Sequence, residues 1–404
     1  MAVFLYMKGK LLISISALVL AFTASCSNPT GPLLPTITII TQPVPARNVA
    51  AGNISGHLSV EASVTKGQLL SFQWFSNDTN SNDRGTAIDG ATGTNFPIPT
   101  DLALWRIYYF FVEVSATGGA IPFRSDVTTV RVINPPSIEM VPVQGGNFEL
   151  GWDLGDDRFH VAPVSFVTVD GFYISRHAIT QGLFETVMGT NPSWFTGAQG
   201  RPPIGWEHER DLPVERVSWY DALVFSNRIS IMKGLTPAYS IAGSTNPDDW
   251  GPVPTNRNEV WDAVKIILES NGYRLPTEAQ WEFAAKGGVQ AMHYSFSGSQ
   301  HVTLVAWYVG NSEGRTRQVG TTITYNELGI FDMSGNVSEW VWDWYGPYTS
   351  DPKTNPTGPS MGFYRVLRGG NWASMYSHVR SVARISRAPW NRLNIDGFRV
   401  IRPQ

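Results

Sequence analysis

The first third of the chain alternates short runs of β-branched and aromatic residues with clusters of turn-forming residues. Apolar runs of this length, bounded by Gly, Asn, Asp and Ser, are typical of β-strands. The pattern extends over residues 38–134 and stops at a Pro-Pro pair, so we expect an all-β module followed by a linker over 135–139. The clearest predicted strands are Thr38–Thr41, Leu58–Val64, Leu70–Phe75, Ile107–Ser115 and Val127–Val132.

The aromatic residues of this module suggest its architecture. Trp74 lies on an early-middle strand, and a later strand carries the run Tyr108–Phe111. Short strands at this spacing around a core tryptophan are typical of an immunoglobulin-like sandwich. The module contains no cysteine, so packing alone would hold its two sheets together. It resembles the spacer modules of bacterial surface proteins.

Residues 140–404 contain few helical patterns, but each has a clear start signal. A Ser or Thr side chain before an amphipathic run can accept hydrogen bonds from the first free backbone amides of a helix. The remaining sequence is loop rich in Gly, Asn and Pro, broken by short strands, which predicts an α+β domain. The predicted helices are Gln181–Met188 after Thr180, Trp219–Lys233 after Ser218, and one after Thr277, where Gln280 completes a capping box.

Composition and charge exclude several functions. The chain has 404 residues, 42% of them hydrophobic, which allows two or three domains with sizeable cores. Its net charge of −3 offers no excess of cations to neutralise phosphates, so we expect no nucleic-acid partner. Its single cysteine can form neither an internal disulfide nor a redox pair.

The N-terminus has the organisation of an export signal. Lys8 and Lys10 precede the apolar run Leu11–Phe22, which is too short to span a membrane comfortably. Small residues then precede Cys26, as in a lipoprotein signal, although Leu20 lies farther from the cysteine than the strict pattern requires. We expect residues 1–26 to be a signal peptide with a lipidated Cys26, and residues 27–37 to be a stalk. The alternative is a plain secretory signal with an incidental cysteine.

The larger domain contains a series of short motifs in a fixed order: Gly145–Phe148, Phe172–Ile174, Leu212–Trp219, Tyr273–Glu282, Asn326–Gly329, Asp332–Trp340, Arg368–Trp372 and Gly397–Arg399. This series resembles the formylglycine-generating-enzyme (sulfatase-modifying factor) family. The resemblance covers roughly residues 140–402 and implies a C-type-lectin-like fold with small sheets and long loops.

The chemistry of the family's enzymes is missing from this chain. The resemblance implies a copper-binding cysteine pair shortly after Trp372, but residues 373–379 and the rest of the domain contain no cysteine. Serine and methionine cannot supply thiolate chemistry at comparable potency. The seven histidines show no closely spaced cluster that would hold iron. We therefore predict a non-catalytic member that binds no copper.

The resemblance also implies one structural calcium ion. Asp332 and Glu339 would provide carboxylate oxygens, and Gly335 and Val337 would provide backbone carbonyls. Hard oxygen ligands on a tight Gly-containing turn suit Ca²⁺. The alternative is that the two acidic residues only cap loops.

Residues 365–400 resemble the variable region of diversity-generating retroelement proteins, in which template adenines are randomised. Interleaved Arg, Pro, Gly and Phe residues would form the fixed frame, and the candidate positions hold amino acids that mutated Asn or Lys codons can encode. The alternative is that they are ordinary loop residues. The predicted ligand-binding residues are Ala373, Ser374, Met375, Tyr376, Ser377, His378, Ser381, Ala383, Ile385, Ser386, Trp390, Leu393, Ile395 and Asp396.

These observations favour a lipoprotein of the outer membrane or cell surface that binds a protein or another cell-surface molecule. Tyr376 and Trp390 would be the anchors, because rigid aromatic side chains provide a large contact area at a low entropy cost. Two alternatives remain open at this point: an oxidoreductase of the formylglycine-generating type, and a structural envelope protein.

Overall fold

The computed structural model describes residues 34–152, 161–197, 202–267 and 269–404. The predicted signal peptide, Cys26 and most of the predicted stalk lie outside the described residues. None of the helices in the described ranges is long and apolar enough to cross a bilayer.

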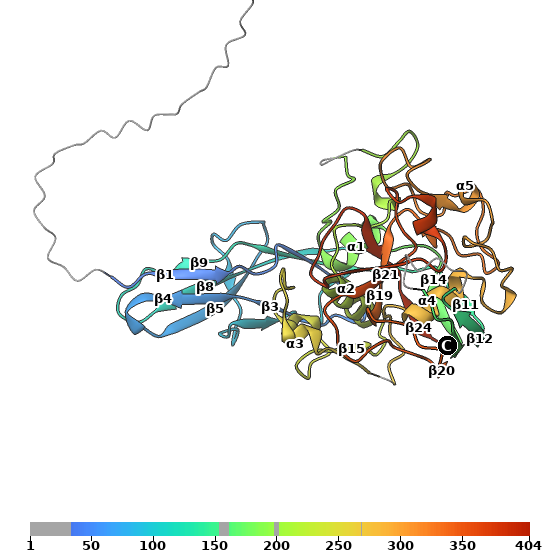
Figure 1. Cartoon of the computed structure of the whole chain (residues 1–404). Helices are drawn as coiled ribbons and strands as arrows, with labels where there is room; N and C mark the ends of the chain where they lie inside the picture. Colours follow the sequence, from blue (N-terminus) through green and yellow to red (C-terminus); the bar gives the residue numbers. More distant parts are fainter. Residues whose placement is uncertain (1–33, 153–160, 198–201, 268) are drawn as a thin grey trace, which may run out of the picture.

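The N-terminal module consists of strands grouped into three sheets (Figure 1). The largest sheet has the order β2-β10-β8-β5-β6, with β9 paired to β8, while β1 pairs with β4 and β3 pairs with β7. The strands are β1 (Ile37–Thr41), β2 (Ala46–Ala50), β3 (His57–Ser59), β4 (Glu61–Val64), β5 (Leu70–Asn77), β6 (Thr86–Ala87), β7 (Asn95–Pro97), β8 (Ile107–Ala116), β9 (Phe123–Arg124) and β10 (Thr128–Ile133).

Trp74 occupies the core of this module, as the sequence predicts. Its ring is fully buried, stacks on Phe96 at 5.5 Å between centroids, and donates its indole N–H to the carbonyl of Gly93 at 2.9 Å. The predicted all-β character is confirmed, and each predicted strand has a counterpart, although Leu58–Val64 is divided into β3 and β4. The sequence analysis missed β2, because its residues ARNVA show no alternation, and it missed three strands of only two or three residues.

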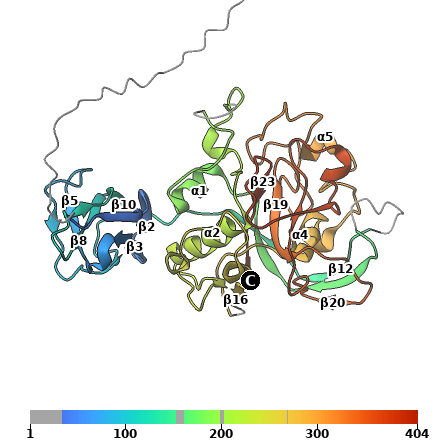
Figure 2. The same cartoon turned by 60° about the vertical axis from the view of Figure 1, so that its left-hand side comes forward.

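The C-terminal domain combines short strands with few helices (Figure 2). Its helices are α1 (Gln181–Met188), α2 (Trp219–Met232), α3 (Glu259–Asp262), α4 (Glu278–Ala285) and α5 (Val302–Val305). Its strands are β11 (Met140–Val143), β12 (Gly146–Leu150), β13 (Ser165–Val169), β14 (Phe172–Ser175), β15 (Tyr239–Ser240), β16 (Lys265–Ile266), β17 (Ala306–Trp307), β18 (Ser334–Gly335), β19 (Ser338–Trp344), β20 (Lys353–Thr354), β21 (Arg365–Arg368), β22 (Arg384–Arg387), β23 (Asp396–Phe398) and β24 (Ile401–Pro403).

The three predicted helices begin where their capping residues place them. The hydroxyl of Thr180 accepts the amide of Leu183 at 3.3 Å. Ser218 and Thr277 each accept an amide in a complete capping box. Helix α2 ends at Met232, one residue before the predicted end, with Lys233 as its C-cap. The two four-residue helices α3 and α5 were not predicted, because a single turn contains too few residues to show a helical period.

A four-stranded sheet with the order β22-β21-β19-β23 forms the centre of the domain. Strand β23 runs parallel to β19, and β24 then pairs with β14 in a separate sheet. Phe398, at the end of β23, is fully buried and packs edge-on against Phe225 of α2 at 5.2 Å. The C-terminal segment is therefore part of the core rather than an appendage.

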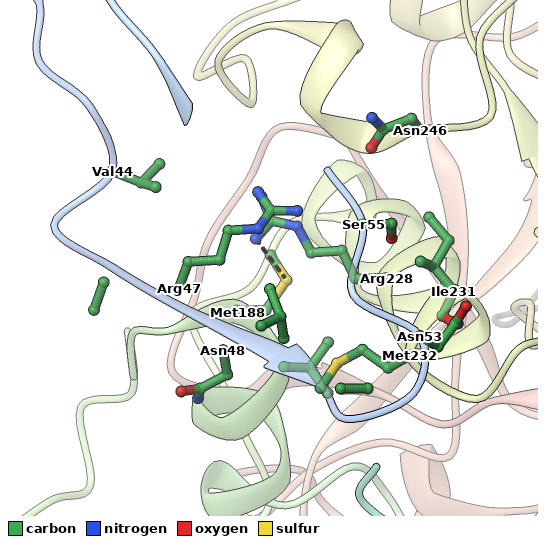
Figure 3. Close-up of a pocket in the computed structure, with 14 residues that line it drawn as sticks. Val44, Arg47, Asn48, Asn53, Ser55, Met188, Arg228, Ile231, Met232 and Asn246 are labelled. Carbon is green, nitrogen blue, oxygen red and sulfur yellow. Dashed lines mark hydrogen bonds between the residues drawn. The ribbon is translucent and has the colours of Figure 1, made fainter. Parts of the chain in front are cut away.

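A buried ion-pair cluster joins the N-terminal module to the larger domain. Arg47 of β2 contacts Asp248 at 2.5 Å, and Arg228 of α2 approaches the same carboxylate at 3.4 Å. Figure 3 shows the side chains of Arg47 and Arg228 next to each other in a small pocket between the two parts. Burial alone would raise the pKa of Asp248, but the two arginines hold it below its ordinary value.

Further contacts across this joint come from β2 and the turn after it. Ala50 belongs to the hydrophobic cluster of the larger domain, and Asn48 donates its side-chain amide to the carbonyl of Thr186 at 2.8 Å. Asn53 donates similarly to the carbonyl of Ile231. The module is thus held against α1 and α2 by apolar, polar and charged contacts.

The joint gives a stability prediction. Asp248→Asn leaves two partly buried arginines without their carboxylate, so we expect the free energy of unfolding in chemical denaturation to fall by about 2 kcal/mol. Because folding lowers the pKa of Asp248, its contribution is present above the ordinary pKa of 3.8 and is lost as the pH falls. The matched control is Asp89→Asn at an exposed position, where a change within about ±0.5 kcal/mol is expected. Equal effects of the two substitutions would contradict the role of the cluster.

Candidate ligand-binding surface

Buried ion pairs with α4 fix the predicted frame of the C-terminal segment. Arg384 of β22 donates to both carboxylate oxygens of Glu278, at 2.8 and 2.6 Å. Arg368 of β21 contacts Glu278 at 3.3 Å and also pairs with Glu282. All four side chains are almost completely buried. Arg368 and Arg384 also donate to backbone carbonyls, and Glu282 also pairs with Lys286, whereas the Nε of Arg368 has no partner among the described residues. These contacts determine where the backbone of residues 381–387 runs.

The predicted frame arginines nearer the end of the chain are also paired. Arg387 contacts Asp396 at 2.8 Å, and Arg392 contacts Asp221 of α2 at 2.8 Å. Pro389 accepts the amide of Trp219 through its carbonyl at 3.0 Å. The frame therefore holds both sides of the segment between β22 and β23.

The predicted contact residues divide into three groups by exposure. Met375, Tyr376 and Leu393 are 66%, 57% and 37% exposed, and Ala373 and His378 are exposed as well. Tyr376 begins a one-turn 3-10 helix, Tyr376–Val379, which the buried side chain of Val379 fixes to the domain. The half-buried group consists of Ser374, Ser377, Ile385, Ser386, Trp390 and Ile395.

Ser381, Ala383 and Asp396 are buried, so the prediction that they contact a ligand conflicts with the structure. The carbonyl of Ser381 accepts a hydrogen bond from Arg368 at 2.9 Å, which draws this residue inward. Ala383 packs in a small cluster with Val161 and Trp152. Asp396 pairs with Ser338 on the central sheet, and burial raises its pKa to about 7 although Arg387 lowers it.

Ile385 and Trp390 lie at the boundary between the core and the solvent. Both are half-buried and pack against the core cluster that contains α2. The ring of Trp390 lies edge-on to the exposed Phe363 at 5.7 Å. The predicted anchor Trp390 is therefore partly a structural residue, whereas Tyr376 is free of the core clusters.

The structure adds residues to this surface that the sequence analysis missed. Trp194 is 42% exposed, and the guanidinium of Arg216 lies 5.8 Å from its ring. The amide of Arg216 donates to the carbonyl of Leu393 at 2.9 Å, which places Trp194 close to the C-terminal segment. On another side, the amide of Val309 donates to the carbonyl of Ser374 at 3.0 Å. Only long-range contacts reveal these neighbours, so no local sequence signal could have found them.

A buried carboxylate holds the Trp194 turn. Glu215 accepts the amides of Trp194 and Phe195 at 2.5 and 2.9 Å, and burial raises its pKa to about 7. Phe195 in turn packs edge-on against Trp372 at 5.4 Å, and the indole of Trp372 donates to the carbonyl of Asn394. The exposed tryptophan is thus presented by a well-supported turn.

The predicted calcium ligands are all buried, but their oxygens are not equally free. Both oxygens of Glu339 are taken, by Arg399 at 2.6 and 2.8 Å and by the indole of Trp281 at 2.6 Å. Asp332 accepts the amide of Gly320 through one oxygen, and its other oxygen has no partner among the described residues. The set therefore fits a calcium ion only in part. Calcium binding stays a prediction, which the melting temperature with added Ca²⁺ and after chelation would test.

No group of three or more His, Cys, Asp or Glu side chains in the described ranges could hold a metal ion. In the short stretch where the resemblance implies the cysteine pair, this chain has exposed Ala373, half-buried Ser374 and exposed Met375.

Comparison with known proteins identifies the family. Residues 129–404 match the sulfatase-modifying factor enzyme 1-like domain. The chain belongs to this family. The match begins within β10, before the predicted start of the domain at 140.

Individual proteins with similar sequences or structures support the assignment to the sulfatase-modifying factor family. The chaperone protein LppX of Paenibacillus barcinonensis is 35% identical over 317 residues, which cover 74% of this chain and 99% of that protein. The formylglycine-generating enzyme of Mus musculus is 26% identical over 318 residues, covering 65% of this chain and 74% of the enzyme. The solved structure of Treponema denticola variable protein 1 has a TM-score of 0.60 and 31% identity, covering 71% of this chain and 97% of that protein. The resemblance to variable proteins is confirmed.

The division between frame and surface gives a second prediction. Phe398→Ala should lower the free energy of unfolding by about 3–5 kcal/mol, because it opens a cavity in the core. Tyr376→Ala should change it by less than about 0.5 kcal/mol, because the ring is largely in solvent. Ile385→Ala should fall between the two, and chemical denaturation measures all three. If Tyr376→Ala destabilises as much as Phe398→Ala, residue 376 belongs to the core and cannot be a display position.

Proposed function

We propose that this protein is a surface-displayed binding protein whose ligand contacts Ala373–His378 together with Ile385, Trp390 and Leu393. One observation carries the proposal: within a single segment, the frame residues Arg384 and Arg387 are buried or half-buried and ion-paired, while Met375, Tyr376 and Leu393 project into solvent. Such a division lets contact residues change while the fold stays the same. The 31% identity to Treponema denticola variable protein 1 supports this interpretation.

The chemistry of this surface suits a protein or cell-surface ligand. Tyr and Trp provide large and rigid contact area, and Ser and His adapt their hydrogen bonds to the partner. Large exposed aromatic residues are also frequent hot spots of binding. Trp194, outside the diversified segment, would add a constant aromatic contact beside Leu393.

We further propose that lipidated Cys26 tethers the protein to the membrane and that the N-terminal module is an immunoglobulin-like spacer. The three-sheet arrangement around Trp74 is compatible with such a module. The ion-paired joint around Asp248 would hold the binding surface in a defined direction relative to the spacer. Metabolic labelling with a tagged fatty acid, abolished by Cys26→Ala, tests the tether.

The DNA around the gene tests the diversification. We expect a nearby template repeat that differs from the codons of residues 365–400 only at adenines. Among clones, substitutions should gather at exposed positions such as Met375, Tyr376 and Leu393, and should spare the frame residues Arg384 and Phe398. Variation spread equally over exposed and frame positions, or a segment that never varies, would contradict the proposal.

The oxidoreductase alternative has a direct test. The purified protein should not convert a sulfatase-type cysteine peptide to the aldehyde, with or without copper, because Cys26 is its only cysteine. A mouse formylglycine-generating enzyme is the positive control. Turnover clearly above the reaction without protein would favour the enzyme instead.

A chaperone is the second candidate function, because the relative at 35% identity carries that name. Exposed apolar side chains such as Met375 and Leu393 could contact a partly folded client. Suppression of aggregation of a thermally unfolded protein, lost on Tyr376→Ala and Met375→Ala together, would favour the chaperone over a binder of one specific folded ligand.

A further inference from the structure

A cavity of about 490 Å³ opens beside the start of α4, lined by residues that are not part of the surface proposed above. Its walls come from the turn between β13 and β14, from the end of β16 and the residues after it, and from the end of β24. Ile266 of β16 and Pro403 near the end of the chain both line it. A cavity of this volume is within the range that holds small organic ligands.

Arg274 provides a cation on the wall of this cavity. Its Nη1 donates to the carbonyl of Leu275 and to the side chain of Gln280, both at 3.1 Å. Within the described part of the chain, no carboxylate lies within ion-pair distance of Arg274, and its Nε and Nη2 have no acceptor. The N–H groups of Nε and Nη2 are therefore available to a ligand.

The fully buried arginines of the domain have their charge balanced in ways that the half-buried Arg274 does not. Arg368, Arg384 and Arg399 each pair with a buried glutamate. Arg365 is enclosed between the rings of Trp219 and Trp344, at 3.7 and 3.4 Å from the guanidinium carbon. Arg274 is half-buried and has no ion-pair partner among the described residues, so an anion in the cavity would compensate a partly desolvated charge.

The charged groups around Arg274 also favour an anion in the cavity. Burial lowers the pKa of Arg274, and Tyr239 and Asp343 oppose this only in part. Asp343 is a weak counter-charge near neutral pH, because burial and the adjacent Glu278 raise its own pKa to about 7. A carboxylate in the cavity would compensate the charge more completely.

The other walls indicate what the carboxylate would be attached to. Phe172, Trp342, Ile266 and Pro403 form apolar surface, and the ring of Trp342 is held by stacking on Tyr239 at 5.4 Å. Asp170, which is exposed and hydrogen-bonded to Asn355, places a negative charge on the wall. That charge disfavours polyanions such as phosphate esters, so a single carboxylate on an apolar body is the best match.

We propose that this cavity binds a small monocarboxylate with an apolar body, whose carboxylate is held by the Nε and Nη2 groups of Arg274. Planar carboxylates match the fork of an arginine in a bidentate way, and Lys cannot reproduce that geometry. The apolar body lies against Trp342 and Ile266. Free organic acids and the last residue of a peptide share this chemistry.

A pair of probes of equal shape tests the proposal on the full-length protein. 3-Phenylpropanoate and its amide differ only in the charged group, and calorimetry or ligand-detected NMR measures their affinities. We expect the acid to bind at least about tenfold more tightly than the amide, which corresponds to 1.4 kcal/mol. Arg274→Gln should abolish the difference, and Arg274→Lys should retain only part of it. The control Arg131→Gln, at an exposed position of β10, should leave it unchanged.

A measurement on the unaltered chain keeps the test decisive if Arg274→Gln does not fold. Contacts between the phenyl protons of the acid and the indole of Trp342 should appear in NOE spectra. Equal affinity of acid and amide, no binding of either, or NOE contacts elsewhere would overturn the proposal. The dipeptide Ala-Phe, compared with the free acid, distinguishes the two sources: the tighter binder identifies the natural ligand class. Binding that persists in Tyr376→Ala shows that this site is independent of the proposed display surface.

Discussion

The buried pairing of Glu278 and Glu282 with Arg368 and Arg384 is the interaction on which the candidate site depends. It connects α4 to two adjacent strands of the central sheet, and both of its arginines belong to residues 365–400, the segment that carries the predicted contact residues. Removing one member would leave a buried charge without its partner, which commonly costs about 3–5 kcal/mol. The segment cannot shift its register without breaking these pairs. Its exposed side chains are consequently presented on a backbone that is determined elsewhere in the domain.

This arrangement separates the requirements of folding from those of recognition. Arg384, Arg387 and Arg392 are interleaved with the half-buried candidate positions Ile385, Ser386 and Trp390. Each of these arginines has an acidic partner on a different element. A ligand-binding surface on a rigid support loses less conformational entropy on binding than a surface made of free loops. The 3-10 helix at Tyr376 and the turn at Trp194 follow the same principle, because a buried residue fixes each of them.

The helices α1, α2 and α4 could be predicted from the sequence, since capping residues and apolar periodicity are local signals. The family motifs also located the C-terminal segment and its frame. The burial of Ser381, Ala383 and Asp396 could not be predicted, because it results from contacts with Arg368, Val161 and Ser338, which lie far away in the sequence. The same reason explains why Trp194 and Arg274 were not recognised. Their significance depends on which residues surround them, and a sequence pattern does not contain that information.

The position of β23 and β24 in the fold has a consequence for how the domain assembles. Arg399, between these strands, donates to the carbonyl of Ser175, 224 positions earlier in the chain, and β23 lies beside β19 in the central sheet. Contacts of such high sequence separation form slowly, because a long loop must close before they become favourable. We therefore expect the edge of β14 and the core around Phe398 to stay incomplete in a nascent chain until the residues after the candidate contact positions have been synthesised. If the segment is diversified as we propose, each variant has to pass through this late step, so the yield of folded protein would select among variants before any ligand does.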